Sequence, residues 1–166
     1  LTTFIEFTKI KNILDFGSGF GDLGFALKKN FENINLNSIE HDKFCSEILN
    51  ERGYKNHLSL DDIPEKSLDL IISLHSLEHL DSLEIFESFR KKLDNNGHIF
   101  FEVPNSTKEY FTGRAFDSPH LFFFTKKSFE KICAKFGFEI VNFSNSSYSY
   151  KMDNTFQSDA QKKYLR

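Results

Sequence analysis

Three side chains that can carry a proton or bind a metal follow the most apolar run of this sequence. His75, Glu78 and His79 come directly after residues 67–74, which read Ser-Leu-Asp-Leu-Ile-Ile-Ser-Leu. Their positions are i, i+3 and i+4, so they share one face if a helix has begun by Leu77. An imidazole can remove a proton from a weakly acidic group, and imidazoles with a carboxylate can hold a divalent ion. This segment is therefore the first candidate for chemistry.

The elements that position these side chains begin with a glycine-rich stretch, residues 13–24. It reads Ile-Leu-Asp-Phe-Gly-Ser-Gly-Phe-Gly-Asp-Leu-Gly. An apolar run that ends in an acid before alternating glycines predicts a buried strand, a tight turn and a helix start, a usual place for a nucleotide-like ligand. One register, Gly19-x-Gly21-x-x-Gly24, fits the dinucleotide pattern, but it starts several residues after the strand and leaves Asp15 unexplained.

The other register, Asp15-x-Gly17-x-Gly19-x-Gly21, resembles motif I of the class I S-adenosylmethionine-dependent methyltransferases. An acid at the strand end suits a cationic ligand and would repel a pyrophosphate. The resemblance covers almost the whole of residues 11–143. It implies an α/β, Rossmann-like fold, with a mostly parallel sheet and helices on both faces. It also implies that S-adenosylmethionine is bound by Asp15, Phe16, Gly17, Ser18, Gly19, Gly21, Glu40, His41, Leu60, Asp61 and Leu74. A purely structural glycine turn is the alternative.

Glu40 matches the acid that binds the ribose in this family. It lies at the end of the second expected strand, about twenty residues past the glycines, where a carboxylate can accept hydrogen bonds from both ribose hydroxyls. The alternative is a solvated acid at a strand end. His41 would border the adenine, and Leu60 and Asp61 would lie at its edge after the third expected strand.

The histidines carry a more specific resemblance. Glu78 and His79 resemble the E-x-x-E-H sequence of two branches, the small-RNA 3′-terminal 2′-O-methyltransferases and the O-methyltransferases of ubiquinone biosynthesis. In the RNA enzymes, two Glu, the His and another His beyond a Pro-Asn pair bind a divalent metal. Here a Pro-Asn pair precedes His120, and His75 replaces the first Glu. The resemblance therefore implies a metal site of His75, Glu78, His79 and His120. Such a donor set suits Zn, Mn, Fe or Co better than Mg.

Two interpretations without a metal stay open for the same residues. In the first, His75, His79 or His120 acts as a general acid or base, or binds the substrate. In the second, the side chains only pack and form hydrogen bonds near the site.

Composition limits the class of protein. A chain of 166 residues fits one domain, residues 1–166, with a real core. A net charge of −3 without a long basic run argues against a nucleic-acid partner. Cys45 and Cys133 have no C-x-x-C partner, which predicts free thiols in a reducing compartment. With no signal peptide or stretch of membrane-spanning length, we expect a cytoplasmic protein that does not enter a membrane; a homodimer is left open.

Sequence patterns also predict the order of the elements. Strands are expected at residues 11–16, 36–40, 57–60, 67–74, 98–103 and 138–143, and helices at 22–31, 43–52, between 80 and 93, and between 125 and 137. Residues 105–124 have no periodicity and are expected to form a lid, in which Tyr110 and Arg114 bind the acceptor. The segment before the first strand is short, residues 145–166 look weakly ordered, and the last strand of the family is poor. A complete N-terminal cap and last strand are therefore not expected.

Together these features predict a methyltransferase that acts on a hydroxyl of a small metabolite or sugar-like acceptor, with or without a metal. A hydroxyl is too weakly acidic to attack unaided, so a metal or His75 or His79 must assist it. Three other functions remain: an N- or C-methyltransferase without a metal, a nucleotide-dependent oxidoreductase, and a non-catalytic cofactor-binding subunit that a partner completes.

Overall fold

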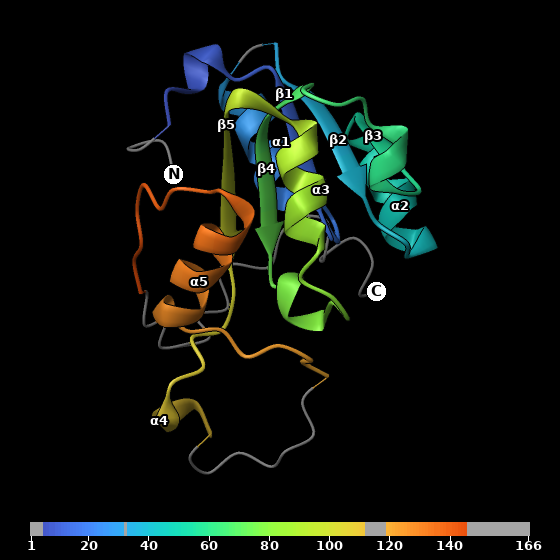
Figure 1. Cartoon of the computed structure of the whole chain (residues 1–166). Coiled ribbons are helices and arrows are strands. Elements are labelled where there is room, and N and C mark those ends of the chain that lie inside the picture. The colour runs from blue at the N-terminus through green and yellow to red at the C-terminus, as the bar shows by residue number, and fades with distance from the viewer. Residues whose placement is uncertain (1–4, 32, 112–118, 146–166) are drawn as a thin grey trace.

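A computed structural model describes residues 5–31, 33–111 and 119–145 of this chain. Its centre is a five-stranded sheet of order β3-β2-β1-β4-β5, in which every neighbouring pair is parallel (Figure 1). The strands are β1 (Asn12–Phe16), β2 (Asn35–Ile39), β3 (Tyr54–His57), β4 (Leu68–Leu74) and β5 (Leu93–Glu102). Because all five run the same way, their carboxyl ends meet at one edge of the sheet.

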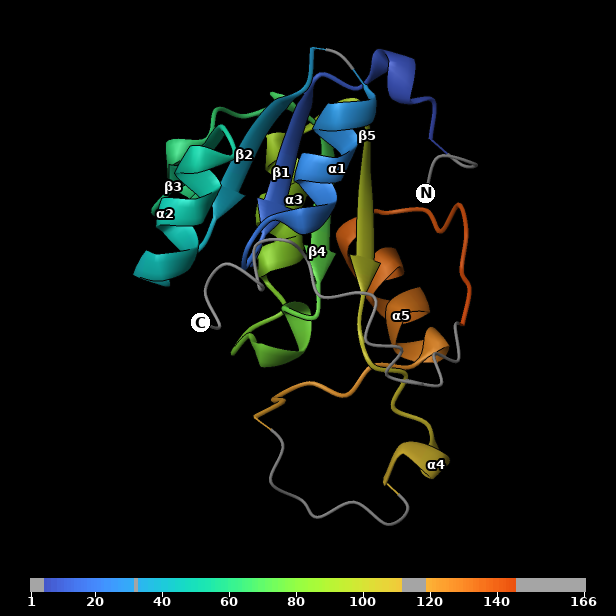
Figure 2. The ribbon, with the colours of Figure 1, turned by 180° about the vertical axis from the view of Figure 1, so that it is seen from behind.

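Helices cover both faces of the sheet. Leu27 of α1 (Asp22–Asn30) and Leu49 of α2 (Lys43–Glu51) pack in one buried cluster with strand residues such as Leu36. The other face is covered by α3 (Ile85–Lys92) and α5 (Lys126–Phe136), as the views from the two sides show (Figure 2). The expected α/β, Rossmann-like architecture is confirmed.

The middle strands follow from their sequences. Leu70, Ile71 and Ile72 of β4 are fully buried, as are Ile13 and Leu14 of β1. Consecutive buried residues are what a parallel strand with helices on both faces requires. The sequence prediction of these two strands holds to within one residue at each end.

Three local predictions were wrong. β3 ends at His57, where a strand was expected to begin. β5 already begins at Leu93, in the segment expected to terminate a helix. Residues 138–143 form no strand: Ile140 and Val141 are exposed, whereas Phe138 and Phe143 pack sideways against the core. The rings of Phe138 and Phe143 therefore pack against the core in place of the strand hydrogen bonds that the alternating apolar residues predicted.

The expected lid, residues 105–124, is only partly described. It holds a short helix, α4 (Lys108–Phe111), and its ends meet through a bridge between Asn105 and Phe124. Closure over a ligand stays a prediction. Across the described ranges, no helix has the length and apolar character needed to cross a membrane.

Candidate functional site

The glycine loop lies at the carboxyl end of β1. Gly17 and Gly21 have φ of 64° and 71°, and Gly21 is the N-cap of α1. Ser76, after β4, donates from its hydroxyl to the Gly17 carbonyl at 3.0 Å. A Cβ on Gly17 would overlap that hydroxyl, so the close approach of the two segments requires glycine here.

Glu40 lies beside this loop. Its carboxylate accepts the Gly19 N–H at 2.8 Å and the Asp42 N–H at 2.9 Å. Asn56 fixes the Glu40 backbone on both sides: its amide donates to the carbonyl at 3.0 Å and its carbonyl oxygen accepts the N–H at 3.1 Å. The sequence-predicted ribose acid is thus held next to the glycines by groups from three segments.

The remaining predicted cofactor residues differ in how deeply they are buried. Asp15 and Leu60 are buried, whereas His41 and Asp61 are exposed. Leu60 and Asp61 belong to a 3-10 turn, Leu60–Asp62, that Ser59 caps. Phe16, Ser18 and Leu74 are half-buried. Contact of any of these residues with a cofactor stays a prediction.

Asp15 has a partner that the sequence did not indicate. The carboxyl is 4% exposed, and burial raises its pKa to about 7 against the opposing hydrogen bond from Tyr54. The Tyr54 hydroxyl lies 3.2 Å from Asp15 Oδ2 and 2.7 Å from the Gly21 carbonyl. Tyr54 is 39 residues from Asp15 in sequence, and the only signal that could have found it is that a buried acid needs a donor.

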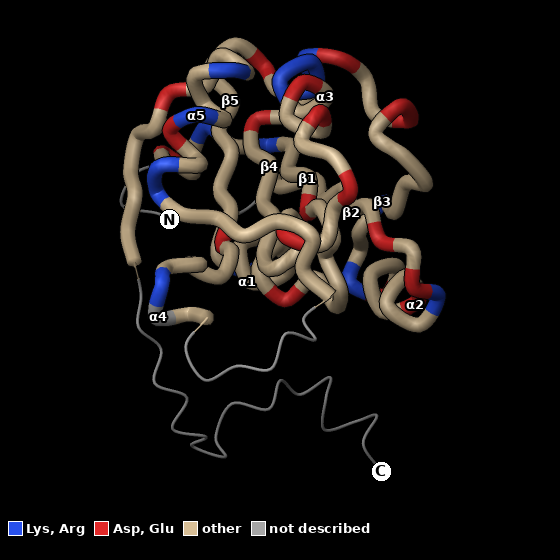
Figure 3. Tube along the Cα trace, turned by 60° about the horizontal axis from the view of Figure 1, so that its bottom comes forward, with Lys and Arg blue, Asp and Glu red and all other residues tan. Residues whose placement is uncertain are grey.

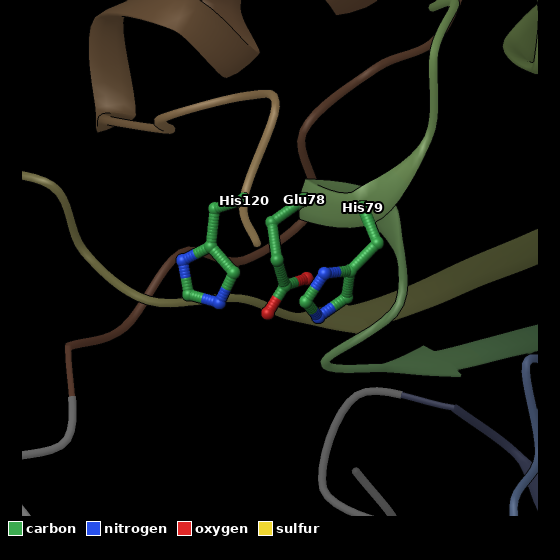
Figure 4. Close-up of side chains that lie close together, drawn as sticks. All are labelled: Glu78, His79 and His120. Atoms are coloured by element: carbon green, nitrogen blue, oxygen red, sulfur yellow. The ribbon is translucent and has the colours of Figure 1, made fainter. Parts of the chain in front are cut away.

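A second group of polar side chains lies beyond β4. One donor atom each of Glu78, His79 and His120 falls within 4.8 Å of the others, and the two imidazole rings are 4.8 Å apart at their centroids (Figure 4). Glu78 is 1% exposed, and neither of its carboxylate oxygens has a hydrogen-bond partner among the described residues. Such a group requires a cation or a proton donor.

Backbone bonds bring His120 to this place. The N–H groups of Leu121 and Phe122 both donate to the Glu78 carbonyl, at 2.7 and 3.0 Å. Tyr110 lies with its hydroxyl 3.2 Å from His120 Nδ1. Residues 42 positions apart in sequence therefore come together through their main chains. Arg114, the other predicted acceptor-binding residue, lies outside the described residues.

His75 does not join this cluster. Its φ is +52°, and the helical turn that carries Glu78 begins only at Leu77. The shared helical face expected from the i, i+3, i+4 spacing therefore does not form. The side chain is 58% exposed, with Nε2 3.3 Å from Glu102 Oε1 and Nδ1 3.6 Å from Glu78 Oε1.

Acidic groups gather at this end of the sheet, where Figure 3 shows Asp and Glu in the segments around β1, β2 and β4. Arg52 also approaches the loop, donating to the Phe20 carbonyl and pairing with Asp22 at 2.6 Å. Asp15, Glu40 and Glu78 accept no hydrogen bond from Lys or Arg among the described residues. The site therefore favours a cationic ligand over a pyrophosphate.

Comparisons with known proteins agree with this geometry. The profile of a family described as a methyltransferase domain matches residues 3–142. No curated protein sequence matches the chain. A structure described as an S-adenosylmethionine-dependent methyltransferase from Archaeoglobus fulgidus has a TM-score of 0.66 and 22% identity, over 80% of this chain and 63% of that one. Another from Aquifex aeolicus has a TM-score of 0.61 and 17% identity, over 80% of this chain and 75% of that one.

At these identities, the structures establish a shared fold. The chain spans 63% of the length of the Archaeoglobus protein, so the match is to part of that protein.

Proposed function

This chain belongs to the methyltransferase-domain family, and we propose that it transfers a methyl group from S-adenosylmethionine to a hydroxyl of a small metabolite or sugar-like acceptor. One observation carries the choice of a hydroxyl. A buried carboxylate that has no hydrogen-bond partner among the described residues lies beside two imidazoles, after the strand that neighbours the glycine loop. An amine would need only a base, whereas a hydroxyl needs stronger activation.

The residues around the glycine loop fit the cofactor. Glu40 receives two backbone N–H groups, and a carboxylate has about four acceptor positions, so two remain for ribose hydroxyls. Asp15 offers a carboxyl to a cationic ligand, and the glycine backbone permits close approach. S-adenosylmethionine supplies an electrophilic methyl group when bound. The role of the protein is to orient it toward the acceptor.

The cluster of Glu78, His79 and His120 fits a divalent metal. Its buried carboxylate, whose oxygens have no hydrogen-bond partner in the part of the chain that the structure describes, forms with two imidazoles a donor set that suits Zn, Mn, Fe or Co. A metal in this place would lower the pKa of an acceptor hydroxyl. We propose three ligands from this chain and not four, because only Glu78, His79 and His120 among the described residues offer donor atoms that all lie within 4.8 Å of one another.

The chain's own residues have defined tasks in this proposal. The Leu121 and Phe122 N–H groups fix His120 against Glu78. Tyr110 orients the His120 ring through Nδ1. Without a metal, His79, whose side chain is exposed, can take the acceptor proton itself; an N- or C-methyltransferase that needs no metal is the alternative.

A partner-dependent subunit is a second candidate. A structure of a Haloferax volcanii methyltransferase activator in complex with a methyltransferase has a TM-score of 0.67 and 12% identity, over 79% of this chain and 65% of that one. Activity of the isolated chain would refute the requirement for a partner.

Ligand-dependent melting tests the cofactor. S-adenosylhomocysteine should raise the melting temperature because it binds the folded state preferentially, and NAD should not. Stabilisation by NAD alone would overturn the proposal.

Metal analysis and activity after chelation and re-addition test the hydroxyl chemistry. His120→Ala should lose the metal and methyl transfer, whereas His98→Gln, which changes an imidazole within β5, should keep both. Full turnover in a chelator would leave the metal-free alternative.

A further inference from the structure

The edge strand β3 reaches the glycine loop through Tyr54. Its register partner is Leu36 on β2, which pairs in turn with Ile13 on β1. The buried ring crosses this face of the sheet, and its hydroxyl lies between the Gly21 carbonyl and Asp15 Oδ2, at 2.7 and 3.2 Å. One hydroxyl thus touches both the first acid and the last glycine of the loop motif.

The ring also accounts for two glycines. A Cβ on Gly21 would lie 2.6 Å from Leu49 and 2.8 Å from the ring of Tyr54, and a Cβ on Gly24 would overlap the Tyr54 hydroxyl. The first turn of α1 is therefore built against this ring. Replacing Tyr54 with Phe keeps the packing and removes only the hydroxyl.

Counting hydrogens shows what the hydroxyl does. A phenol has one hydrogen to donate, and two oxygens lie within reach of it. While Tyr54 donates to Gly21, an ionised Asp15 receives nothing from it, whereas a protonated Asp15 can donate to the phenol oxygen. The bonds from Asp15 through Tyr54 to Gly21 are therefore complete only when Asp15 is protonated. For an ionised Asp15 to receive a hydrogen bond from Tyr54, the hydroxyl hydrogen must turn from the Gly21 carbonyl to Asp15.

The surroundings of Asp15 agree with a proton held near neutrality. Burial raises its pKa to about 7, the charges of Glu40 from the end of β2 and Asp22 from α1 also raise it, and the hydrogen bond from Tyr54 lowers it. Burial raises the pKa of Tyr54 well above its usual value, and Arg52 opposes that rise, so the phenol stays neutral.

We propose that Tyr54 is a positioning residue for the cofactor, whose hydroxyl couples ionisation of Asp15 to the conformation of the glycine loop. A cationic cofactor favours the Asp15 carboxylate, and Tyr54 then stabilises that carboxylate by turning its hydrogen from Gly21 to Asp15. Binding should accordingly release a proton near neutral pH. This inference rests on the proposed binding of S-adenosylmethionine.

Calorimetry of S-adenosylmethionine binding between pH 6 and 8.5, without an acceptor, tests it, with buffers of different ionisation enthalpy to count protons. The wild-type affinity should rise with pH through about 7. In Tyr54→Phe the affinity at pH 7 should fall roughly tenfold, for loss of a hydrogen bond to a charged group. The pH midpoint of the rise in affinity should move to higher pH in Tyr54→Phe, because the hydrogen bond from Tyr54 that lowers the pKa of Asp15 is gone.

Two controls separate coupling from packing. His57→Gln changes a titrating group of β3 whose Nε2 bonds to Asn37, so its midpoint should match the wild type. Asp15→Asn should lose the part of the proton release that belongs to Asp15.

Each failure has its own signature. If the wild type binds no S-adenosylmethionine at any pH, the proposed function fails. If the wild type binds but Tyr54→Phe shows the same pH midpoint of affinity as the wild type, the inference is overturned. A lower melting temperature, or an affinity that is weaker by the same factor at every pH, would not rescue it.

Discussion

The carboxylates at the ends of β1 and β2 and the carboxylate that follows β4 differ in the hydrogen-bond donors that the protein offers them. On the β1–β2 side, Asp15 and Glu40 have hydrogen-bond donors from Tyr54 and from two backbone N–H groups. On the β4 side, Glu78 is as deeply buried as Asp15, yet neither oxygen has a hydrogen-bond partner among the described residues. A buried charge is costly unless it is paired. On the first side the hydrogen-bond donors come from the described residues, whereas on the second side Glu78 has imidazoles nearby, among them that of His75, with Nδ1 3.6 Å from Oε1.

The largest expected effect concerns Asp15 and tests whether the β1–β2 side is fully compensated. Its pKa is raised from 3.8 to about 7, so the stability it contributes is present below pH 4 and is lost as the pH rises through 7. The full loss is about 4 kcal/mol. Unfolding in denaturant at pH values between 4 and 8 measures it: the unfolding free energy of the ligand-free wild type should fall by this amount relative to that of Asp15→Asn.

Asp94→Asn, which changes an exposed acid of β5, serves as the control and should follow the wild-type curve. Parallel curves for Asp15→Asn and the wild type would mean that Tyr54 and nearby groups compensate the charge completely.

Glu78 tests the other side of the comparison. Glu78→Gln keeps the shape but removes the charge, so methyl transfer should fall roughly a hundredfold, about 2.7 kcal/mol. Metal content should fall with it. In a chelator, the melting temperature of this variant should equal or exceed that of the wild type, because the variant no longer buries a carboxylate that lacks a hydrogen-bond partner among the described residues. A large destabilisation with normal turnover would make Glu78 a structural acid.

Glu40→Ala sharpens the cofactor side. If Glu40 holds both ribose hydroxyls, the affinity for S-adenosylhomocysteine should weaken by about 2 kcal/mol in calorimetry. Glu47→Ala removes an exposed acid of α2 and should leave the affinity unchanged. Equal affinities for both variants would reduce Glu40 to an acid that only organises the loop.

The smallest effect concerns the contact that joins the two sides. Gly17→Ala places a Cβ at positive φ and against the Ser76 hydroxyl, so unfolding free energy should fall by about 1 kcal/mol. The double variant with Ser76→Gly removes the overlap and should recover part of this loss, measured in denaturant. No recovery would assign the whole effect to backbone strain.

The sequence by itself determined the elements whose signals are local. The apolar runs of β1 and β4 predicted buried parallel strands, because a strand covered on both faces cannot alternate with polar residues. The alternating glycines predicted the tight turn, since a left-handed backbone and a close approach favour glycine. The position of Glu40 also followed, because β2 runs parallel to β1 and ends at the same edge.

Only the tertiary structure decided which distant side chains meet. Tyr54 on β3 reaches Asp15 on β1 across the one intervening strand β2, and His120 is brought to Glu78 by a backbone contact far along the chain. His75 lies near Glu78 in sequence but turns toward Glu102, because its left-handed backbone places it outside the helical turn. Residues 138–143 carry the alternation of a strand but pack by their rings instead. Local patterns fix periodicity and turns, whereas such contacts depend on the register of the sheet and the paths of the loops, which no short stretch of sequence encodes.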